Sequence, residues 1–373
     1  MYDEKPRILR PAFPAGKRVI VISDIHANLP YFKALLEKIR FSADDILILD
    51  GDFLEKGPDS LGTLRFVMEL TKQGNVWPVL GNCDEWPLIF LRHPEGNEHM
   101  KRYFRRRRYG FLYEMLLALG IDPLAVERPS EVLPVVEKAF PEEWAFLRAL
   151  PHAIETEHFI FVHAGMNGAV PLEENHFREL TTRDAFLQEG QKFDKWIVTG
   201  HWPVVLYGEG IVCANPIICE QQHIICLDGG CVLKDDGQLN ALILPDISCA
   251  DAAKFTSVYY DPFPTAEVLE SQAAGEHFWY IRWGDNEVQV LSRGEEFSRC
   301  RHLRTGYEMD ILTKYLYSPE EITTCNDCTD YLLPLEKGDT VSIIETTSRG
   351  YFVKHNGVSG WYYGKLKGEG NAR

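Results

Sequence analysis

The segments RVIVISDIHAN (residues 18–28) and DILILDGDFLEKG (residues 45–57) decide the expected fold. Each begins with a run of β-branched and leucine residues long enough for one buried strand, and each continues into acidic and small residues. Helices are expected at about residues 31–39 and 60–70, and a third strand at 76–80. Strands that alternate with helices at this spacing indicate βαβ units and a largely parallel sheet.

The same α/β domain is expected to continue to about residue 247. Residues 86–150 carry no strand pattern, so we expect them to form a helical cap inserted between two strands. Later strands are expected at four places, the last three of which have hairpin-like spacing: residues 159–162, 196–198, 224–227 and 239–244. The predicted fold class is therefore a layered α/β domain with a cap insertion.

After Pro245 the sequence changes to short β runs with glycine turns and aromatic residues. The segment LPLEKGDTVSIIETTSRGYFVKHNGVSGWYYGKL resembles a bacterial SH3-like barrel in its KGD turn, its Asn356-Gly357 hairpin and its Gly360-Trp361 strand start. We therefore expect an α/β domain at 1–247 and an SH3-like barrel at 307–373. Residues 248–306 are either a β-containing linker or a second small β module. The barrel would offer a site for a peptide or protein partner.

Composition and charge limit the classes of function. The chain has 373 residues, of which 45% are apolar and 25% charged, as in ordinary soluble globular proteins. Its net charge of −16 argues against generic binding to nucleic-acid phosphates. No apolar run is long enough to span a membrane, and the charged N-terminus shows no secretory signal. The nine cysteines lie mostly in expected strands, which favours reduced thiols in a cytoplasmic protein.

Six potential metal ligands stand just after expected strands. They are Asp24, His26, Asp52, Asn82, His163 and His201. Because the carboxyl ends of strands in an open α/β sheet converge on one crevice, we expect these side chains to meet there. Each alone would be read as a turn residue or a structural histidine, but six at five strand ends are hard to obtain by chance. Oxygen and imidazole donors without thiolate suit Mn²⁺, Fe or Zn²⁺.

The motifs SDIHAN, GDFLEKG, GNCDE, HAG and GH are similar to the signature GDxHG, GDxxDRG, GNHE, HAG and GH. That signature belongs to the phosphoprotein phosphatase branch of the calcineurin-like metallophosphoesterase superfamily, which includes Ser/Thr phosphatases and symmetrical dinucleoside tetraphosphatases. The resemblance covers about residues 17–245, including the closing segment IICLDGGCVLKDDGQLNALIL. It implies a layered αββα metallophosphoesterase fold.

The resemblance also implies a centre of two divalent metal ions, with Mn²⁺ expected first and Fe, Zn²⁺ or Mg²⁺ as alternatives. Asp24, His26 and Asp52 would hold the first metal. Asp52 would bridge to a second metal, which Asn82, His163 and His201 would also hold. The two metals would share a hydroxide placed for attack on phosphorus.

Four further positions bear on catalysis in this resemblance. Arg183 stands where the family carries a phosphate-binding arginine, although a surface salt bridge is the alternative. Lys56 replaces the arginine of DRG and keeps its charge, although a solvated loop lysine is equally compatible with the sequence. The histidine of GNHE is Cys83, and the aspartate of DRG is Glu55. In the family these two positions form a pair that protonates the leaving group, and a thiol is a poor substitute for an imidazolium.

Other clusters have simpler explanations. The basic run Lys101, Arg102, Arg105, Arg106, Arg107 and Arg108 is expected to be a solvated helix face, with a positive rim for an anionic substrate as the alternative. The lone pair Cys325 and Cys328 lacks the further ligands that a zinc site needs. His152, His158, His176 and His223 lack motif context and are expected to be structural or surface residues.

Three functions follow from these patterns. The leading one is a phosphomonoesterase acting on a phosphorylated protein or a small phosphorylated compound. The second is hydrolysis of a phosphodiester or a dinucleoside polyphosphate, which the changes at Cys83 and Glu55 favour. The third is a metal-containing scaffold that recruits a partner through its SH3-like domain, against which the complete ligand set argues.

Overall fold

The computed structural model describes residues 5–90 and 96–367 and divides into two compact units. The first unit comprises Met1–Val204, Asn215–Leu233 and Gly237–Tyr260. The second unit is assembled from Val205–Ala214, Lys234–Asp236 and Asp261–Arg373. The chain therefore enters the second unit twice, briefly, before residue 261.

The first sheet of the first unit has the strand order β12-β11-β2-β3-β4. Its three parallel strands are β2 (Val19–Ile22), β3 (Ile46–Asp50) and β4 (Val76–Val79), joined by α1 (Leu29–Lys38) and α2 (Ser60–Thr71). This part confirms the predicted βαβ units. At the other edge, β11 (Leu239–Leu244) and β12 (Thr256–Tyr260) run antiparallel, so this sheet ends beyond residue 247.

The second sheet of this unit has the order β1-β5-β6-β7-β10-β9. Its strands are β1 (Ile8–Leu9), β5 (Ala153–Glu155), β6 (Phe159–Phe161), β7 (Trp196–Thr199), β9 (Ile217–Cys219) and β10 (Ile224–Cys226). The expected hairpin spacing of the late strands is wrong. β10 runs parallel to β7, and β11 crosses into the first sheet, because the segments between these strands are long enough for crossover connections.

Alternating side chains of the parallel strands pack into two hydrophobic cores, one on each face of the first sheet. Val19 and Val21 face the second sheet and pack with Phe159 and Phe161 from it. Ile20 and Ile22 face the helices and pack with residues of α1 and α2. Burial on both faces explains why the strands read as continuous apolar runs rather than as alternating ones. These layers form the αββα arrangement.

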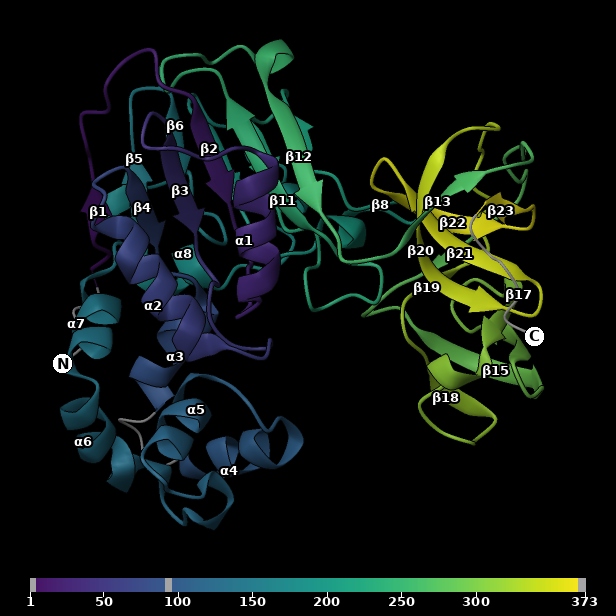
Figure 1. The fold of residues 1–373 in the computed structure, drawn as a ribbon, viewed down its shortest axis with the longest axis horizontal. Helices are drawn as coiled ribbons and strands as arrows, with labels where there is room; N and C mark the ends of the chain where they lie inside the picture. The colour runs from purple at the N-terminus through teal and green to yellow at the C-terminus, as the bar shows by residue number, and fades with distance from the viewer. Residues whose placement is uncertain (1–4, 91–95, 368–373) are drawn as a thin grey trace. The chain divides into compact units, whose positions relative to one another are not determined.

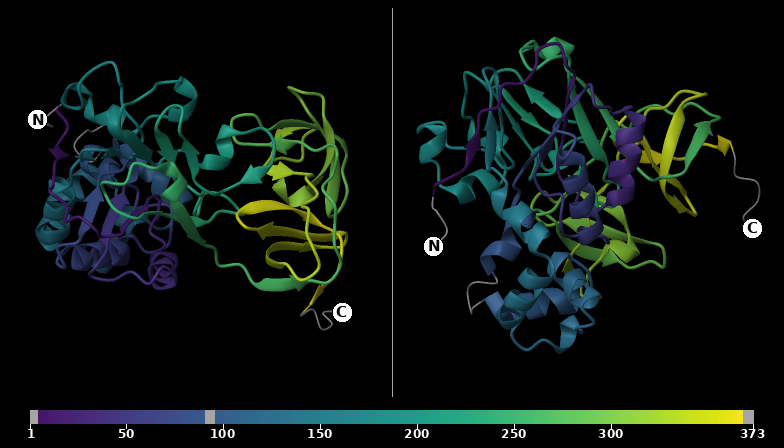
Figure 2. Two further views of the ribbon diagram at one scale, coloured as in Figure 1. Left: turned by 90° about the horizontal axis from the view of Figure 1, so that it is seen from above. Right: turned by 60° about the vertical axis from the view of Figure 1, so that its left-hand side comes forward.

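The cap insertion is helical, as predicted. It contains α3 (Asn82–Phe90), α4 (Gly96–Arg106), α5 (Phe111–Ala118), α6 (Pro129–Ala139) and α7 (Pro141–Ala149); residues 91–95 lie outside the described range. Figures 1 and 2 show α4, α5 and α6 grouped beyond the end to which β2 and β3 point. The short helix α8 (Phe177–Thr181) lies later in this unit. The cap thus stands over the carboxyl ends of the parallel strands.

The second unit is built mainly of antiparallel sheets. A six-stranded sheet has the order β23-β13-β20-β21-β22-β8, and a four-stranded sheet has the order β17-β16-β15-β18. The bounds of these strands are β8 (Val212–Cys213), β13 (Thr265–Val268), β15 (Glu287–Ser292), β16 (Phe297–His302), β17 (Glu308–Leu312), β18 (Ile322–Thr324), β20 (Thr340–Thr347), β21 (Gly350–His355), β22 (Val358–Tyr362) and β23 (Leu366–Lys367). A two-stranded sheet pairs β14 (Tyr280–Ile281) with β19 (Cys328–Thr329).

Residues 248–306 are shared among four sheets. β12 completes the first sheet of the first unit, β13 joins the six-stranded sheet, β14 belongs to the two-stranded sheet, and β15 and β16 form the middle of the four-stranded one. These small all-β sheets are compatible with SH3-like modules. Across residues 5–90 and 96–367, the structure contains no helix that is both long enough and apolar enough to cross a membrane.

Candidate metal centre

Several of the predicted ligands stand on turns that follow the strands, and the backbones of these residues are strained. Asp24, His26 and Asp52 have φ angles of 55°, 48° and 52°, in the left-handed region that L-residues rarely adopt. A hydrogen bond joins the turn that carries Asp24 and His26 to the turn that carries Asp52. The backbone N–H of His26 donates to the carbonyl of Asp52 at 2.9 Å. Strain of this kind persists where surrounding structure enforces it, and it is common at functional sites.

Glycine precedes several ligands because a side chain there would displace them. A Cβ on Gly200, which stands before His201, would overlap the Oδ2 atom of Asp24. A Cβ on Gly81, before Asn82, would overlap the backbone nitrogen of Asp52. The glycines of the GN and GH motifs are therefore required by the close approach of one strand-end turn to the next.

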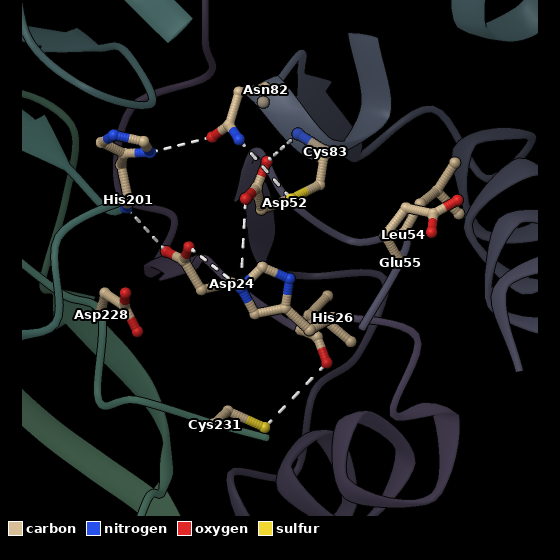
Figure 3. Close-up of polar contacts among 12 residues, drawn as sticks. Asp24, His26, Asp52, Leu54, Glu55, Asn82, Cys83, His201, Asp228 and Cys231 are labelled. Atoms are coloured by element: carbon tan, nitrogen blue, oxygen red, sulfur yellow. Dashed lines mark hydrogen bonds and ion pairs between the residues drawn. The ribbon is translucent and has the colours of Figure 1, made fainter. Parts of the chain in front are cut away.

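Asp52 belongs to two groups of possible ligand atoms. One group consists of Asp24, Asp52 and His163, and the other of His26, Asp52 and Cys83. Within each group the ligand atoms lie within 4.8 Å of one another, and all these residues are buried. Figure 3 shows Asp24, His26 and Asp52 directed into one space. A carboxylate shared by two ligand groups is what a bridging metal ligand requires.

The three remaining candidate ligands lie close to one another. They are Asn82, His163 and His201. The Oδ1 atom of Asn82 lies 2.8 Å from Nδ1 of His201 and 3.2 Å from Nε2 of His163. His163 Nδ1 lies 2.8 Å from the backbone carbonyl of Asp50, to which it donates. With Nδ1 donating to the backbone, Nε2 is the ring nitrogen that faces the centre, where a metal would take the place of its proton.

Several buried polar atoms at the centre lack a hydrogen-bond partner. Within the described part of the chain, both ring nitrogens of His26 and the Oδ1 atom of Asp24 are buried and make no hydrogen bond. Burial without a partner is costly for such atoms, and groups of this kind are normally paired or bound to a metal. The donor set therefore fits divalent cations.

Charge at the centre supports the same conclusion. Burial, together with the nearby Asp228, raises the pKa of Asp24 well above its ordinary value. Burial also raises the pKa of Asp228 to about 6. Burial lowers the pKa of His26 to about 3, so its imidazole is neutral and able to bind a metal. Buried carboxylates placed this close to one another repel, and cations between them would relieve that repulsion.

Lys56 interacts electrostatically with this centre, whereas Arg183 is engaged by Glu189. Burial alone would lower the pKa of Lys56, but Coulombic interactions with Cys83, Asp52 and Asp24 raise it above its ordinary value. Arg183 donates from Nε and Nη2 to the two carboxylate oxygens of Glu189, at 2.7 Å and 2.8 Å. Its guanidinium fork is therefore occupied by a carboxylate.

The two altered motif positions have separate surroundings. Glu55 accepts hydrogen bonds from the hydroxyl of Tyr103 and from the backbone N–H of Phe111, both in the cap. Figure 3 shows the Glu55 carboxylate apart from the cluster around Asp52. The thiol of Cys83, in contrast, lies in one of the two ligand groups.

Sequence reasoning missed two acidic residues of this site. Asp228 is fully buried just after β10 (Ile224–Cys226), and the strand-end rule that found the six ligands would have found it too. Asp184 places its Oδ1 atom 3.1 Å from Nε2 of His201. No sequence signal marks Asp184, because it follows no strand.

The basic run at residues 101–108 and the four histidines without motif context have the structural or surface roles expected for them. Arg102, Arg105, Arg106 and Arg108 are exposed on and just after α4, and Lys101 pairs with Glu98 and Glu127. His152 accepts from the backbone N–H of Arg7, and His223 donates to the carbonyl of Phe193. His176 accepts from the backbone N–H of Arg178, and His158 is half-buried near Glu157. None of these four histidines belongs to the ligand groups formed by the described residues.

Comparison with known proteins agrees with this geometry. A family model described as calcineurin-like phosphoesterase matches residues 17–230, more than half of the chain. The chain belongs to the calcineurin-like phosphoesterase family. All six candidate ligands lie within the matched residues.

Two curated relatives of this chain carry the same name. A symmetrical bis(5'-nucleosyl)-tetraphosphatase of Aggregatibacter actinomycetemcomitans is 30% identical over 147 residues, which are 38% of this chain and 50% of the relative. The same enzyme of Wigglesworthia glossinidia brevipalpis is 43% identical over 63 residues, which are 17% of this chain and 22% of that one. The chain thus spans half or less of the length of these relatives.

Two solved structures align with this chain at low identity. A serine/threonine phosphatase of Saccharomyces cerevisiae is 12% identical, with a TM-score of 0.42, and the alignment covers 70% of this chain and 85% of that one. A metallophosphoesterase of Sphaerobacter thermophilus is 15% identical, with a TM-score of 0.38, covering 65% and 88%.

Proposed function

We propose that the protein hydrolyses phosphate esters at a centre of two divalent metal ions. The observation that carries this proposal is the position of Asp52, whose carboxylate belongs to both groups of ligand atoms. Bound divalent ions supply Lewis acidity and lower the pKa of a coordinated water towards neutrality. In this proposal Asp24, His26 and Asp52 hold one ion, and Asn82, His163 and His201 join Asp52 at the other.

Positive side chains would hold the phosphate group. The ammonium of Lys56 interacts electrostatically with Asp52 and Asp24, and in this proposal it contacts a phosphate oxygen as a point charge. Arg183 would add a bidentate contact, which first requires its release from Glu189. Cys83 stands where an acid would be placed, but a thiol protonates a leaving group poorly.

The leading substrate class is a phosphomonoester, either on a phosphorylated protein or on a small compound. Dinucleoside polyphosphates are the second candidate, because the relatives are named as tetraphosphatases. Phosphodiesters form a third class. Turnover of an aryl monoester, an aryl diester and a dinucleoside tetraphosphate, each with added Mn²⁺, would rank the three classes.

The proposal extends to the identity of the metal, the cellular compartment and the partner of the second unit. Mn²⁺ is the metal expected first, and the cytoplasm is the expected compartment. The all-β unit is proposed to be SH3-like and to recruit a peptide or protein partner. A scaffold without catalysis is not favoured, because the six ligands converge on one buried space.

The decisive experiment removes the shared carboxylate. We expect Asp52→Asn to abolish turnover of an aryl phosphate and to lower the metal content, because both ions lose a ligand. His201→Ala should lower occupancy of one ion more than of the other. Asp44→Asn, at an exposed position, is the matched control and should change neither quantity. More than a few per cent of wild-type turnover in Asp52→Asn would refute the proposal.

A further inference from the structure

Cys83 forms a compact group with two of the expected metal ligands. One ligand atom each from His26, Asp52 and Cys83 lies within 4.8 Å of the other two, and all three residues are buried. The sequence pattern marked Cys83 only as the replacement of a catalytic histidine. Its position in the fold, however, brings the sulfur to the metal ligands (Figure 3).

The surroundings of Cys83 fix the sulfur in this position. Its backbone N–H donates to Oδ1 of Asp52 at 2.7 Å, which ties the first turn of α3 to the shared carboxylate. The side-chain amide of Asn82 donates to the sulfur at 3.6 Å, while its Oδ1 atom faces His201. Asn82 therefore presents its oxygen to one half of the centre and its N–H to the sulfur in the other half.

A second observation points to a ligand at this place. Both ring nitrogens of His26 are buried without a hydrogen-bond partner among the described residues, and the ring lies beside Asp52 and Cys83. The Nε2 atom of His26 lies 3.7 Å from Asp24 and 3.9 Å from Asp52, too far for a hydrogen bond. A buried imidazole without a hydrogen bond, next to carboxylates and a thiol, is a set of donors that a transition-metal ion would satisfy.

We propose that Cys83 is a thiolate ligand of the metal ion that His26 and Asp52 hold. This inference rests on the proposed two-metal centre and adds a ligand to it. On binding, the metal–sulfur bond replaces the S–H bond and one proton passes to solvent, so no oxidant or reductant is needed. The half of the centre assigned to Asp24, His26 and Asp52 then also contains a thiolate, and the other half contains no sulfur.

A thiolate ligand changes which metal the site prefers. Sulfur donors favour Zn²⁺, Co²⁺ and Fe²⁺ over the harder Mn²⁺ and Mg²⁺. The sequence-based expectation of Mn²⁺ assumed oxygen and nitrogen donors alone. We therefore expect the two halves of the centre to differ in metal preference, with the softer ion beside Cys83.

The test uses the full chain loaded with Co²⁺, which reports sulfur ligation by a thiolate-to-metal charge-transfer band in the near ultraviolet. We expect the band in the unmodified protein and its loss in both Cys83→Ser and Cys83→Ala. The matched control is Cys325→Ser, which removes another buried thiol, one of a neighbouring pair in the second unit. This control should keep the band.

Competition between Zn²⁺ and Mn²⁺, followed by equilibrium dialysis and elemental analysis, gives a second readout. Loss of a supporting residue beside a metal ligand typically costs about 10–100-fold in affinity, so loss of the ligand itself should cost at least about tenfold. We expect Cys83→Ser to lose at least that much Zn²⁺ affinity and to change less in Mn²⁺ affinity.

The outcomes separate this inference from the proposed function. Metal binding and hydrolysis without a sulfur band in the unmodified protein would overturn the role of Cys83 and leave the two-metal hydrolase intact. A band that survives Cys83→Ser but disappears in Cys325→Ser would place the sulfur ligand in the second unit and would also overturn it. Absence of stoichiometric metal from the unmodified protein would defeat both proposals.

Discussion

Glu55 accepts a 2.6 Å hydrogen bond from the hydroxyl of Tyr103, and this contact joins the loop that carries Asp52 to helix α4 of the cap. The other oxygen of Glu55 accepts the backbone N–H of Phe111, the first residue of α5, at 2.7 Å. The carboxylate is 1% exposed. Glu55 therefore anchors the cap through both of its oxygens.

This buried anchor should make stability depend on pH. Burial raises the pKa of Glu55 to about 7 from an ordinary value of 4.5. Between those values the folded state binds more protons than the unfolded state, so the contribution of Glu55 to stability falls as pH rises. The loss is complete above pH 7 and amounts to roughly 3 kcal/mol.

Glu55→Gln removes this titration and keeps a hydrogen-bonding group at both contacts. We expect it to gain stability relative to the unmodified protein as pH rises from 4.5 to 8, measured by urea unfolding in the presence of a chelator. Glu98→Gln, at an exposed position, should show no such trend. A constant difference between Glu55→Gln and the unmodified protein across this range would contradict the prediction.

Gly200 is needed to keep Asp24 in place. A methyl group at position 200 would overlap Oδ2 of Asp24, and that atom also accepts the backbone N–H of His201 at 3.0 Å. Gly200→Ala should therefore lower metal content and turnover together. Gly210→Ala, where the added methyl group meets open space, should leave both unchanged. Normal metal content in Gly200→Ala would show that the turn can adapt.

Glu189 should compete with the phosphate group of the substrate for the guanidinium group of Arg183. Both carboxylate oxygens of Glu189 accept from that guanidinium, in a pair that is only partly exposed. Glu189→Gln should lower KM for an aryl phosphate, and Arg183→Ala should raise it, with smaller effects on kcat. If neither substitution changes KM, the pair is a structural salt bridge and Arg183 does not bind the phosphate.

The absence of an imidazole at position 83 should appear in the dependence of rate on the leaving group. Loss of a general acid costs about 10²–10⁴-fold for poorly leaving alkoxides and little for aryl oxides. Turnover across a series of phosphate monoesters should therefore fall steeply as the pKa of the leaving group rises. A flat dependence would mean that another residue protonates the leaving group.

The extent of the first unit can be tested by shortening the chain. All candidate ligands lie before residue 202, and β12 ends at Tyr260. A chain that ends after Tyr260 should hydrolyse a small aryl phosphate. A chain that ends near residue 247 lacks β12 and leaves β11 as an unpaired edge, so it should melt at a lower temperature. Equal melting temperatures would show that β12 adds nothing.

The sequence by itself determined the βαβ order, the helical cap and the six candidate ligands. These features can be read from short stretches of sequence. A buried strand appears as a continuous apolar run, and each candidate ligand stands at the end of such a run. Asp228 also stands just after a strand, so the same rule could have predicted it from the sequence. The resemblance to the family adds an expected assignment of these candidate ligands to two metals, which local patterns alone do not give.

Only the tertiary structure decided which side chains meet. It placed β10 and β11 in different sheets, turned Glu55 towards Tyr103, and paired Arg183 with Glu189. It also brought the sulfur of Cys83 to His26 and Asp52, across 57 residues and 31 residues of sequence respectively. Contacts between residues this distant depend on how sheets and cap pack together, and no local pattern of residues encodes that packing.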